Sequence, residues 1–262
     1  MGGDKLNGRR ALVSGAASGI GAAIATAMAA EGATVAIHAR RLDQLKQTAE
    51  AIASFGGKAV PVTADLRSAA SIQAMAEDAL DKLGGLDILV NNAGCFGIAS
   101  VLEMDEELWD RTMDTNLKAP WLVTRALLKP VVASGANGRL IYTSSVSAKM
   151  SEASGSAYNA SKAGLLAFMY CVAAEVAPHG VTANAICPGW IDTPMARDFW
   201  TQVANADGKS FDELYQANMR TNMMRAMVEP KDIAEMAVHL ASPGARFVTA
   251  QAINVCGGMC YW

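Results

Sequence analysis

Two residues with acid–base chemistry stand about one helical turn apart. Tyr158 and Lys162 are four positions apart in a segment predicted to be helical, so their side chains share one face. A tyrosine that exchanges protons near neutral pH needs its pKa lowered, at a cost of about 4 kcal/mol. One ammonium ~4 Å away, at an effective dielectric constant of ~20, supplies about that much. The pair can therefore serve a carbonyl or alcohol oxygen, although this spacing alone is also a common accident of protein surfaces.

A glycine-rich run near the start of the chain predicts a dinucleotide site. Ser14-Gly15-Ala16-Ala17-Ser18-Gly19-Ile20-Gly21 follows a strand-like segment and precedes a helical one. Glycines at such a turn let the backbone approach a pyrophosphate, and the helix N-terminus supplies N–H donors and the positive end of a dipole. The strand–turn–helix context is what this mechanism requires, so the run favours dinucleotide binding.

The end of the second predicted strand indicates which dinucleotide is bound. An NAD site usually places Asp or Glu there to accept from the ribose 2′-OH, but this chain has Ala39, Arg40 and Arg41. The planar guanidinium fork of Arg40 suits a 2′-phosphate, which favours NADP(H) over NAD(H). The alternative is a solvated helix start in which Arg40 caps or pairs locally, since Asp43 follows.

Short apolar segments alternate with longer helical ones along the chain. The expected strands are residues 10–14, 34–39, 58–63, 87–91, 138–143, 182–187 and 252–255, and the expected helices are 20–30, 42–55, 69–83, 105–133, 157–177 and 230–240. Several strands are apolar on both faces, as in a sheet covered on both sides. We therefore predict an α/β fold with a single doubly wound, Rossmann-type parallel sheet of about seven strands, with helices on both faces. Residues 1–262 are expected to form one dinucleotide-binding oxidoreductase domain.

Taken together, these motifs resemble those of the short-chain dehydrogenase/reductase family over essentially the whole chain. The matching features are the glycine loop Gly15 to Gly21, Asp65 after the third strand, Asn91-Asn92-Ala93-Gly94 after the fourth, Asn116 in the next helix, Ser145 thirteen residues before Tyr158, and Pro188-Gly189 with Thr193.

The resemblance implies a catalytic set of Asn116, Ser145, Tyr158 and Lys162. Tyr158 would be the general acid/base, and Lys162 would hold the nicotinamide ribose and lower the pKa of Tyr158. Ser145 would bond the substrate oxygen, with Ser144 as the neighbouring alternative that the family spacing disfavours. Asn116 would anchor a water linking Lys162 to solvent. The implied cofactor contacts are Ser14, Gly15, Ser18, Gly19, Ile20, Gly21, Arg40, Arg41, Asp65, Leu66, Asn92, Ala93, Gly94, Tyr158, Lys162, Pro188, Gly189, Ile191 and Thr193.

Two further stretches bear on which members of the family the chain resembles. The ending AQAINVCGG, together with Arg40, is similar to the ketoreductases of aromatic polyketide synthesis and to some 3-oxoacyl reductases. However, the proline-glycine-glycine run that follows NNAG in the polyketide enzymes is absent, and Cys95-Phe96-Gly97-Ile98 stands there instead.

The insertion from Trp190 to Val228 is the one irregular piece. It carries Met195, Phe199, Trp200, Phe211, Leu214, Tyr215, Met219, Met223, Met224 and Met227. A helical hairpin that packs its own apolar face explains part of this. An insertion after the sixth strand also overhangs the carboxyl ends of the strands, where ligands bind. We therefore predict a mobile helical lid, about 190–228, over a bulky apolar substrate, with Phe96, Met150 and Trp190 as walls.

Composition excludes several other classes of protein. Hydrophobic residues make up 52% of the chain and charged residues 18%, with a net charge of −3, so we expect neither a nucleic-acid nor a membrane partner. Five scattered cysteines, with CGGMC interpreted as two packed thiols, and three separated histidines predict a cytoplasmic protein with no metal site. The apolar run GLLAFMYCVAA after Lys162 predicts a homo-oligomer, either a dimer or a homotetramer.

The leading hypothesis is an NADPH-dependent carbonyl reductase acting on a ketone of a bulky apolar or 3-oxoacyl-type substrate, with Tyr158 as the proton donor. The alternative is an NAD-dependent dehydrogenase of a secondary alcohol. A non-catalytic NADPH-binding protein is less favoured, because the complete catalytic set is present.

Overall fold

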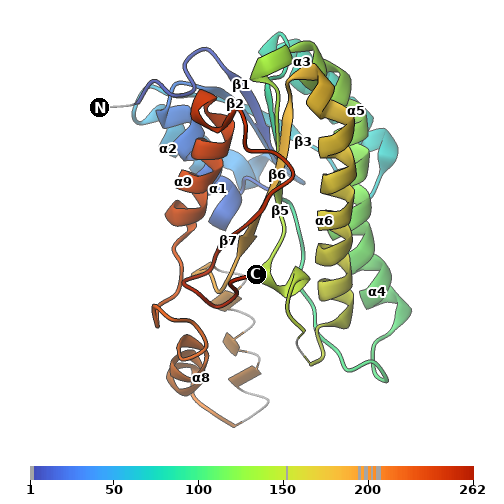
Figure 1. Cartoon of the computed structure of the whole chain (residues 1–262), viewed down its shortest axis with the longest axis vertical. Coiled ribbons are helices and arrows are strands. Elements are labelled where there is room, and N and C mark those ends of the chain that lie inside the picture. The colour runs from blue at the N-terminus through green and yellow to red at the C-terminus, as the bar shows by residue number, and fades with distance from the viewer. Residues whose placement is uncertain (1–2, 152, 194–195, 198–199, 202, 205–207) are drawn as a thin grey trace.

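Seven parallel strands form one sheet in the order β3-β2-β1-β4-β5-β6-β7 (Figure 1). They are β1 (Arg10–Val13), β2 (Thr34–Ala39), β3 (Lys58–Thr63), β4 (Ile88–Asn91), β5 (Arg139–Thr143), β6 (Thr182–Pro188) and β7 (Ala252–Val255). This computed structural model describes residues 3–151, 153–193, 196–197, 200–201, 203–204 and 208–262. The predicted seven-stranded sheet is confirmed. The strand order reverses direction between β1 and β4, so a crevice is expected at their carboxyl ends.

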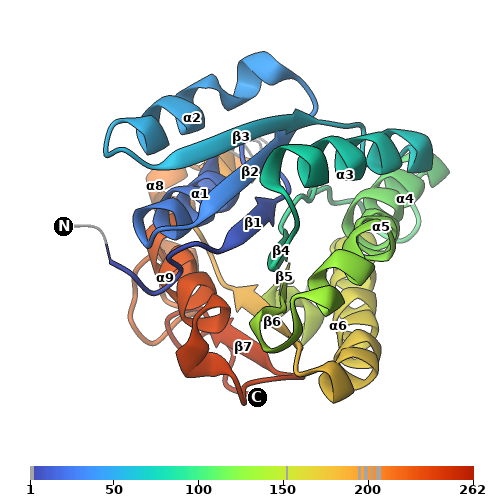
Figure 2. The ribbon, with the colours of Figure 1, turned by 90° about the horizontal axis from the view of Figure 1, so that it is seen from above.

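Helices cover both faces of the sheet, as Figure 2 shows from above. One face carries α1 (Gly19–Ala30), α2 (Lys46–Ala53) and α9 (Pro230–Ala241), and the other carries α3 (Ala69–Leu83), α4 (Glu106–Met113), α5 (Ala119–Ala133) and α6 (Ser156–Val176). A further helix, α8 (Phe211–Met219), lies below the sheet, within the insertion 190–228 that was predicted to be a lid (Figure 1).

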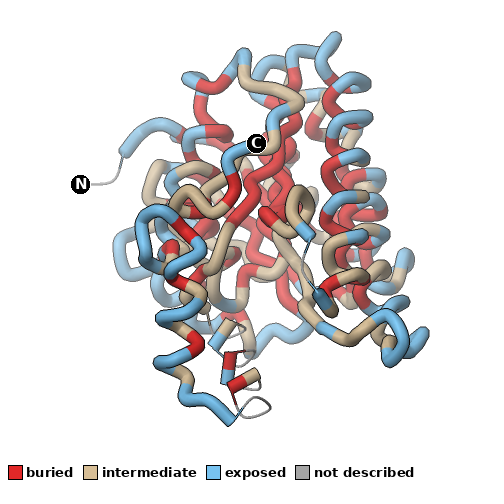
Figure 3. The backbone as a smooth tube through the Cα atoms, turned by 60° about the horizontal axis from the view of Figure 1, so that its bottom comes forward, coloured by how far each residue is buried: buried red, intermediate tan, exposed pale blue. Residues whose placement is uncertain are grey.

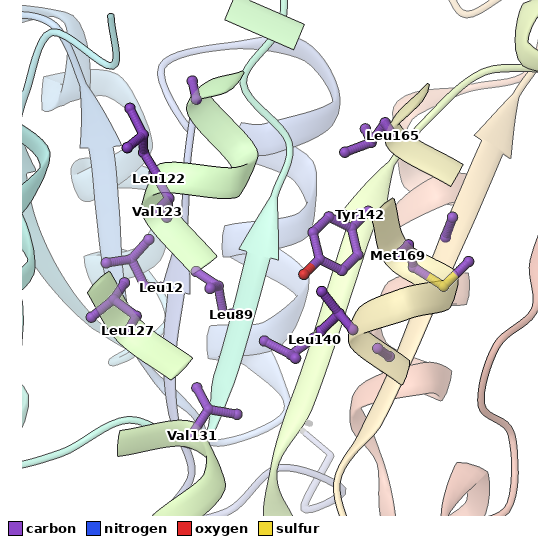
Figure 4. Close-up of a cluster of buried hydrophobic side chains, with 14 of the residues drawn as sticks. Leu12, Leu89, Leu122, Val123, Leu127, Val131, Leu140, Tyr142, Leu165 and Met169 are labelled. Atoms are coloured by element: carbon purple, nitrogen blue, oxygen red, sulfur yellow. The ribbon is translucent and has the colours of Figure 1, made fainter. Parts of the chain in front are cut away.

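The strands are buried on both faces, which is why their sequences are continuously apolar rather than alternating. Figure 3 shows the buried sheet inside helices that expose only their outer sides. On one face, Leu89 of β4 and Leu140 of β5 belong to one apolar cluster with Leu127 of α5 and Met169 of α6, beside Tyr142 (Figure 4). The Tyr142 hydroxyl lies 3.0 Å from Thr124 Oγ1, which also accepts from Asn91 Nδ2 at 3.1 Å. A polar network therefore completes an otherwise apolar core.

The helix expected over residues 105–133 contains an interruption. It runs as α4, then a π-helical turn over Asp114–Lys118, then α5. The side chain of Asn116 in this turn holds both backbone polar groups of Cys95, accepting from its N–H at 2.8 Å and donating to its carbonyl at 3.0 Å. π turns often occur at functional sites, because one extra residue re-aims a side chain. The periodicity of apolar residues in the sequence could not predict this turn.

Helix α6, with its short extension to His179, is long and apolar enough to cross a membrane by length and composition alone. In the structure 44% of its apolar window is buried inside the fold. Core helices of globular proteins pass the same test, so the length of α6 is weak evidence for a membrane span.

The lid is closed at its base and has a small core of its own. Val228 N–H donates to Trp190 O at 2.9 Å, and a parallel bridge joins Ile191 to Val228. Trp200, Ala204 and Leu214 are buried together, with Trp190 packed against them. Met195 and Phe199, which the sequence placed in the lid, lie outside the described residues.

Candidate active site

A cavity of about 550 Å³ opens at the carboxyl ends of the strands. It is lined by the glycine loop, by residues at the ends of β2 to β6, and by Tyr158 and Lys162. This is the position expected from the reversal of strand order between β1 and β4. The expected site residues on its wall are Gly15, Ser18, Gly19, Ile20, Gly21, Arg40, Asp65, Leu66, Asn92, Ala93, Gly94, Ser145, Tyr158, Lys162, Pro188, Gly189, Ile191 and Thr193. Three expected residues do not line it: Ser14, Arg41 and Asn116.

Ser14 acts from behind the cavity wall. Its buried hydroxyl accepts from the N–H groups of Asn92 and Ala93, at 3.0 and 3.1 Å, and lies 3.3 Å from Val90 O. A methyl group on Gly15 would lie 2.8 Å from Ala93 Cα, and one on Gly21 would overlap Gly15 O. The glycine loop is therefore drawn tightly against the end of β4, with no room for side chains.

The first turn of α1 is open toward the cavity. Ser18 is the N-cap residue, yet its side chain makes no capping bond. The backbone N–H groups at this helix start are therefore available to an anion, as a pyrophosphate requires. A cradle that glycines keep clear, beside an uncapped helix start, fits a dinucleotide.

His38 supports this loop, a role that the sequence did not reveal. Its Nδ1 accepts from Gly15 N–H at 3.2 Å, and its Nε2 lies 3.2 Å from Ala64 O. These partners require the neutral ring with its proton on Nε2. Burial lowers the pKa of His38, which keeps the ring neutral. The spacing of histidines in a sequence indicates only whether they could bind a metal together. No sequence signal therefore indicated the contact between His38 and Gly15.

Arg40 and Arg41 separate at the mouth of the cavity. Arg41 pairs with Asp43 at 2.9 Å and lies off the cavity wall. The local pairing considered for Arg40 is therefore made by Arg41, while Arg40 lines the cavity. Beside it, Arg67 bonds Asp65 at 3.0 Å and holds the pKa of that carboxyl below its usual range. Arg67 also lines the cavity and was not expected.

The expected catalytic residues converge at the other end. Lys162 Nζ lies 5.7 Å from the centre of the Tyr158 ring and donates to Thr143 O at 2.9 Å. A methyl group on Gly94 would lie 3.2 Å from Asn116 Oδ1 and 3.5 Å from Lys162 Nζ, so all three residues meet around this glycine. Asn116 lies directly behind the wall, and its Nδ2 also donates to Ser161 Oγ at 3.1 Å.

The two neighbouring serines have different surroundings. Ser144 Oγ donates to Lys162 O at 3.0 Å. Ser145 Oγ accepts from Ser147 N–H at 3.1 Å, and no acceptor for its proton is recorded among the described residues. Ser145 therefore keeps a donor for an oxygen in the cavity, as the family spacing implied.

The apolar walls match part of the expected set. Phe96 and Trp190 line the cavity, and the Phe96 ring stands edge-on to Tyr158 with centroids 4.7 Å apart. Met150 does not line it and packs on the core instead. Met259 lines it, although no motif pointed there. Within the described ranges, no group of three or more His, Cys, Asp or Glu is placed to hold a metal.

Comparison with known proteins agrees with this geometry. A family model described as enoyl-(acyl carrier protein) reductase matches residues 15–260. A protein of Streptomyces virginiae assigned as the ketoacyl reductase of the monensin polyketide synthase is 36% identical over 256 residues, covering 96% of this chain and 97% of the relative. The Escherichia coli oxidoreductase UcpA is 34% identical over 258 residues, covering 97% and 95%.

Solved structures agree as well. A crystal structure of an actinorhodin polyketide ketoreductase variant with NADPH superposes with a TM-score of 0.93 at 36% identity, covering 97% of this chain and 98% of that one. The chain belongs to the short-chain dehydrogenase/reductase family. It is an NAD(P)-dependent oxidoreductase acting on CH–OH or C=O groups.

Burial of the Lys162 ammonium should lower the stability of the folded protein. Burial lowers the pKa of Lys162 to about 8 from an ordinary 10.5, a penalty on the order of 3 kcal/mol at neutral pH. Lys162→Met removes this penalty and loses the charge-assisted hydrogen bond to Thr143 O, worth about 1.5–3 kcal/mol. We therefore expect the free energy of unfolding of the variant at pH 7 to exceed that of the wild type by up to roughly 1.5 kcal/mol, while turnover is lost.

The pH dependence gives the control. The unfolded lysine holds its proton up to about pH 10.5 and the folded one only to about 8, so stability of the wild type rises between these values. The advantage of Lys162→Met should therefore shrink from pH 8 to pH 10.5 in denaturant titrations. An advantage that stays constant over this window would contradict the assigned cause.

Proposed function

We propose that this chain is an NADPH-dependent carbonyl reductase that acts on a ketone with a bulky apolar or 3-oxoacyl-type substituent, working as one domain over residues 1–262. The observation that carries the proposal is the convergence of Ser145, Tyr158 and Lys162 at one end of a cavity whose other end presents Arg40. The names of the ketoreductase relatives agree with the reaction class.

The reaction balances with the residues present. When bound, the reduced nicotinamide supplies the hydride for the carbonyl carbon. Ser145 donates to the carbonyl oxygen, and Tyr158 gives that oxygen its proton, so the product is the alcohol. Lys162 Nζ lies 5.7 Å from the centre of the Tyr158 ring, so its charge would stabilise the tyrosinate left behind, and its ammonium would hold the ribose of the bound cofactor. In the π turn, Asn116 bonds both backbone polar groups of Cys95 and the hydroxyl of Ser161, next to Lys162, and it would anchor a water that brings the proton from solvent.

Removing the acid tests this assignment. Tyr158→Phe deletes only the hydroxyl, so we expect NADPH oxidation with bicyclic or aryl ketones to fall by 10²–10⁴-fold, the usual contribution of a positioned acid. The measurement is the absorbance decrease of NADPH under saturating cofactor. Ser144→Ala is a suitable comparison, because the Ser144 hydroxyl donates to the backbone carbonyl of Lys162. Unchanged turnover in Tyr158→Phe would remove Tyr158 from the mechanism.

Arg40 supports NADPH over NADH in this proposal. It is exposed at the cavity mouth, and no ion pair is recorded for it in the described part of the chain, so its guanidinium can bond a 2′-phosphate bidentately. Asp43, the carboxylate that could have competed, is occupied by Arg41.

The cofactor preference is tested by binding. Losing a charged phosphate contact costs roughly 1.5–3 kcal/mol, so Arg40→Ala should weaken NADPH binding about 10–150-fold and leave NADH nearly unchanged. Fluorescence titration measures both dissociation constants. Lys46→Ala removes a nearby, highly exposed cation that pairs with Glu50 and controls for net charge. Equal binding of both nucleotides by wild type would favour the alternative, an NAD-dependent alcohol dehydrogenase.

We further propose a homo-oligomer, in the cytoplasm, assembled through α6. The outward side of this helix carries small residues, the exposed Ala160, Ala163 and Ala167 with Cys171, which let another helix approach closely. Trp121 on neighbouring α5 is 43% exposed, a large apolar side chain on the same layer. Such a surface is more apolar than a monomer requires.

A bulky charge on α6 tests the interface. Ala167→Arg places a desolvated cation where helices would meet, so the species seen by light scattering should shift from dimer or tetramer to monomer. A wild type that is monomeric at micromolar concentration would contradict the proposal.

A further inference from the structure

The segment Cys256–Trp262, which follows the last strand, contacts the insertion 190–228 and the segment after Ser145, and it contributes Met259 to the cavity wall. We infer that this segment is a wall of the substrate site and that Met259 is a specificity-determining residue that sets how large a ketone substituent fits. The inference rests on the proposed carbonyl reductase function.

The segment is a tight turn anchored in the core. Its two glycines, Gly257 and Gly258, have φ of 62° and 80°, a conformation other residues rarely adopt. Cys256 and Cys260 are 4% and 2% exposed, and Cys260 N–H donates to Cys256 Sγ at 3.4 Å. The two thiols are therefore packing groups that hold the ends of the turn. Met259, just before the second thiol, lines the cavity.

The first contact is with the lid. Met224 N–H donates to Gly257 O at 3.1 Å. A methyl group added to Gly258 would lie 2.9 Å from Met223 Sδ. The insertion at Met223 and Met224 therefore packs directly on the backbone of the two glycines, so the position of this turn supports that part of the insertion.

The second contact is with the segment that carries Ser145. Ser145 is the N-cap of a 3₁₀ turn over Val146–Ala148, which leads into Lys149. Lys149 O accepts from Trp262 Nε1 at 3.3 Å, and Lys149 Nζ donates to Asn254 Oδ1 at 2.7 Å. Asn254 Nδ2 in turn donates to Cys260 O at 3.0 Å. The segment and the residue that would bond the substrate oxygen are thus held in one network.

The third contact is the cavity itself. The thioether of Met259 shares the wall with Phe96 and Trp190, two aromatic side chains of the apolar end. A ketone held at Ser145 and Tyr158 must place its larger substituent among these side chains. Methionine is flexible and fills irregular apolar space, so its length limits the substituent.

Shortening that side chain tests the inference. With phenyl alkyl ketones of increasing chain length as substrates, Met259→Ala should raise the ratio of kcat/KM for long over short ketones about tenfold, the usual effect of a changed apolar pocket. Binding of NADPH should stay within about twofold, since the cofactor site is not altered. Met236→Ala is the matched control, because Met236 is also a half-buried methionine but lies on α9, off the cavity wall.

A second pair of variants tests the turn as a support. Gly258→Ala and Gly56→Ala both force a side chain onto φ of 80°, but a methyl group at Gly56 has nothing within 4 Å. Both should lower thermal stability, and only Gly258→Ala should raise KM for the ketone, by about fivefold or more, with a smaller change in kcat.

Three results would overturn the inference. The first is a chain-length profile of Met259→Ala that equals that of wild type. The second is a Gly258→Ala enzyme with the KM of Gly56→Ala. The third is a wild type that binds NADPH yet reduces no ketone, which would contradict the proposed function and this inference together. In the first two results the wild type is active, so they contradict the inference alone.

Discussion

The close approach of two backbone loops at the ends of β1 and β4 is the constraint on which the site depends. The Ser14 hydroxyl accepts from two successive N–H groups of the β4 loop, at 3.0 and 3.1 Å, and Gly15 leaves no space for a side chain beside Ala93. His38 fixes the same loop from the other side. From this point the chain adds β2 and β3 on one side of β1 and adds β4 to β7 on the other side. The loops that follow β1 and β4 therefore lead to opposite faces of the sheet, and a ligand crevice opens between them.

Electrostatics divide the cavity into two ends. Arg40 and Arg67 line one end together with the carboxylate of Asp65, which Arg67 bonds, and this excess of positive charge suits a doubly charged phosphate. At the other end lie the buried ammonium of Lys162, with Ser145 and the rings of Tyr158 and Phe96, and the exposed guanidinium of Arg111, which is close to Gly97. Burial of the Lys162 cation is costly, and in the proposed mechanism this cation acts on the Tyr158 oxygen, which would be stability given up for function.

Helix α6 serves the core, the site and the proposed interface with different faces. Leu165 and Met169 pack on the sheet, Tyr158 and Lys162 face the cavity, and Ala163 and Ala167 face outward. This threefold use explains why the helix is apolar almost all round and why it passes a length test for membrane spans. The proposed catalytic residues Tyr158 and Lys162 are thereby carried on a long, well-packed element, which holds them in fixed positions.

The sequence by itself determined the sheet, its layers and the residues of the glycine loop and catalytic pair. Apolar strands, glycine punctuation and the four-residue spacing of Tyr158 and Lys162 are local signals, each read within one element. Only the tertiary structure decided that Arg41 takes Asp43 and leaves Arg40 at the cavity, that His38 supports Gly15, and that Met259 rather than Met150 lines the substrate end. These depend on contacts between segments distant in sequence, or on a choice between adjacent side chains with equal propensity. Local pattern carries no information about either, because the energy of such contacts exists only once the elements have packed.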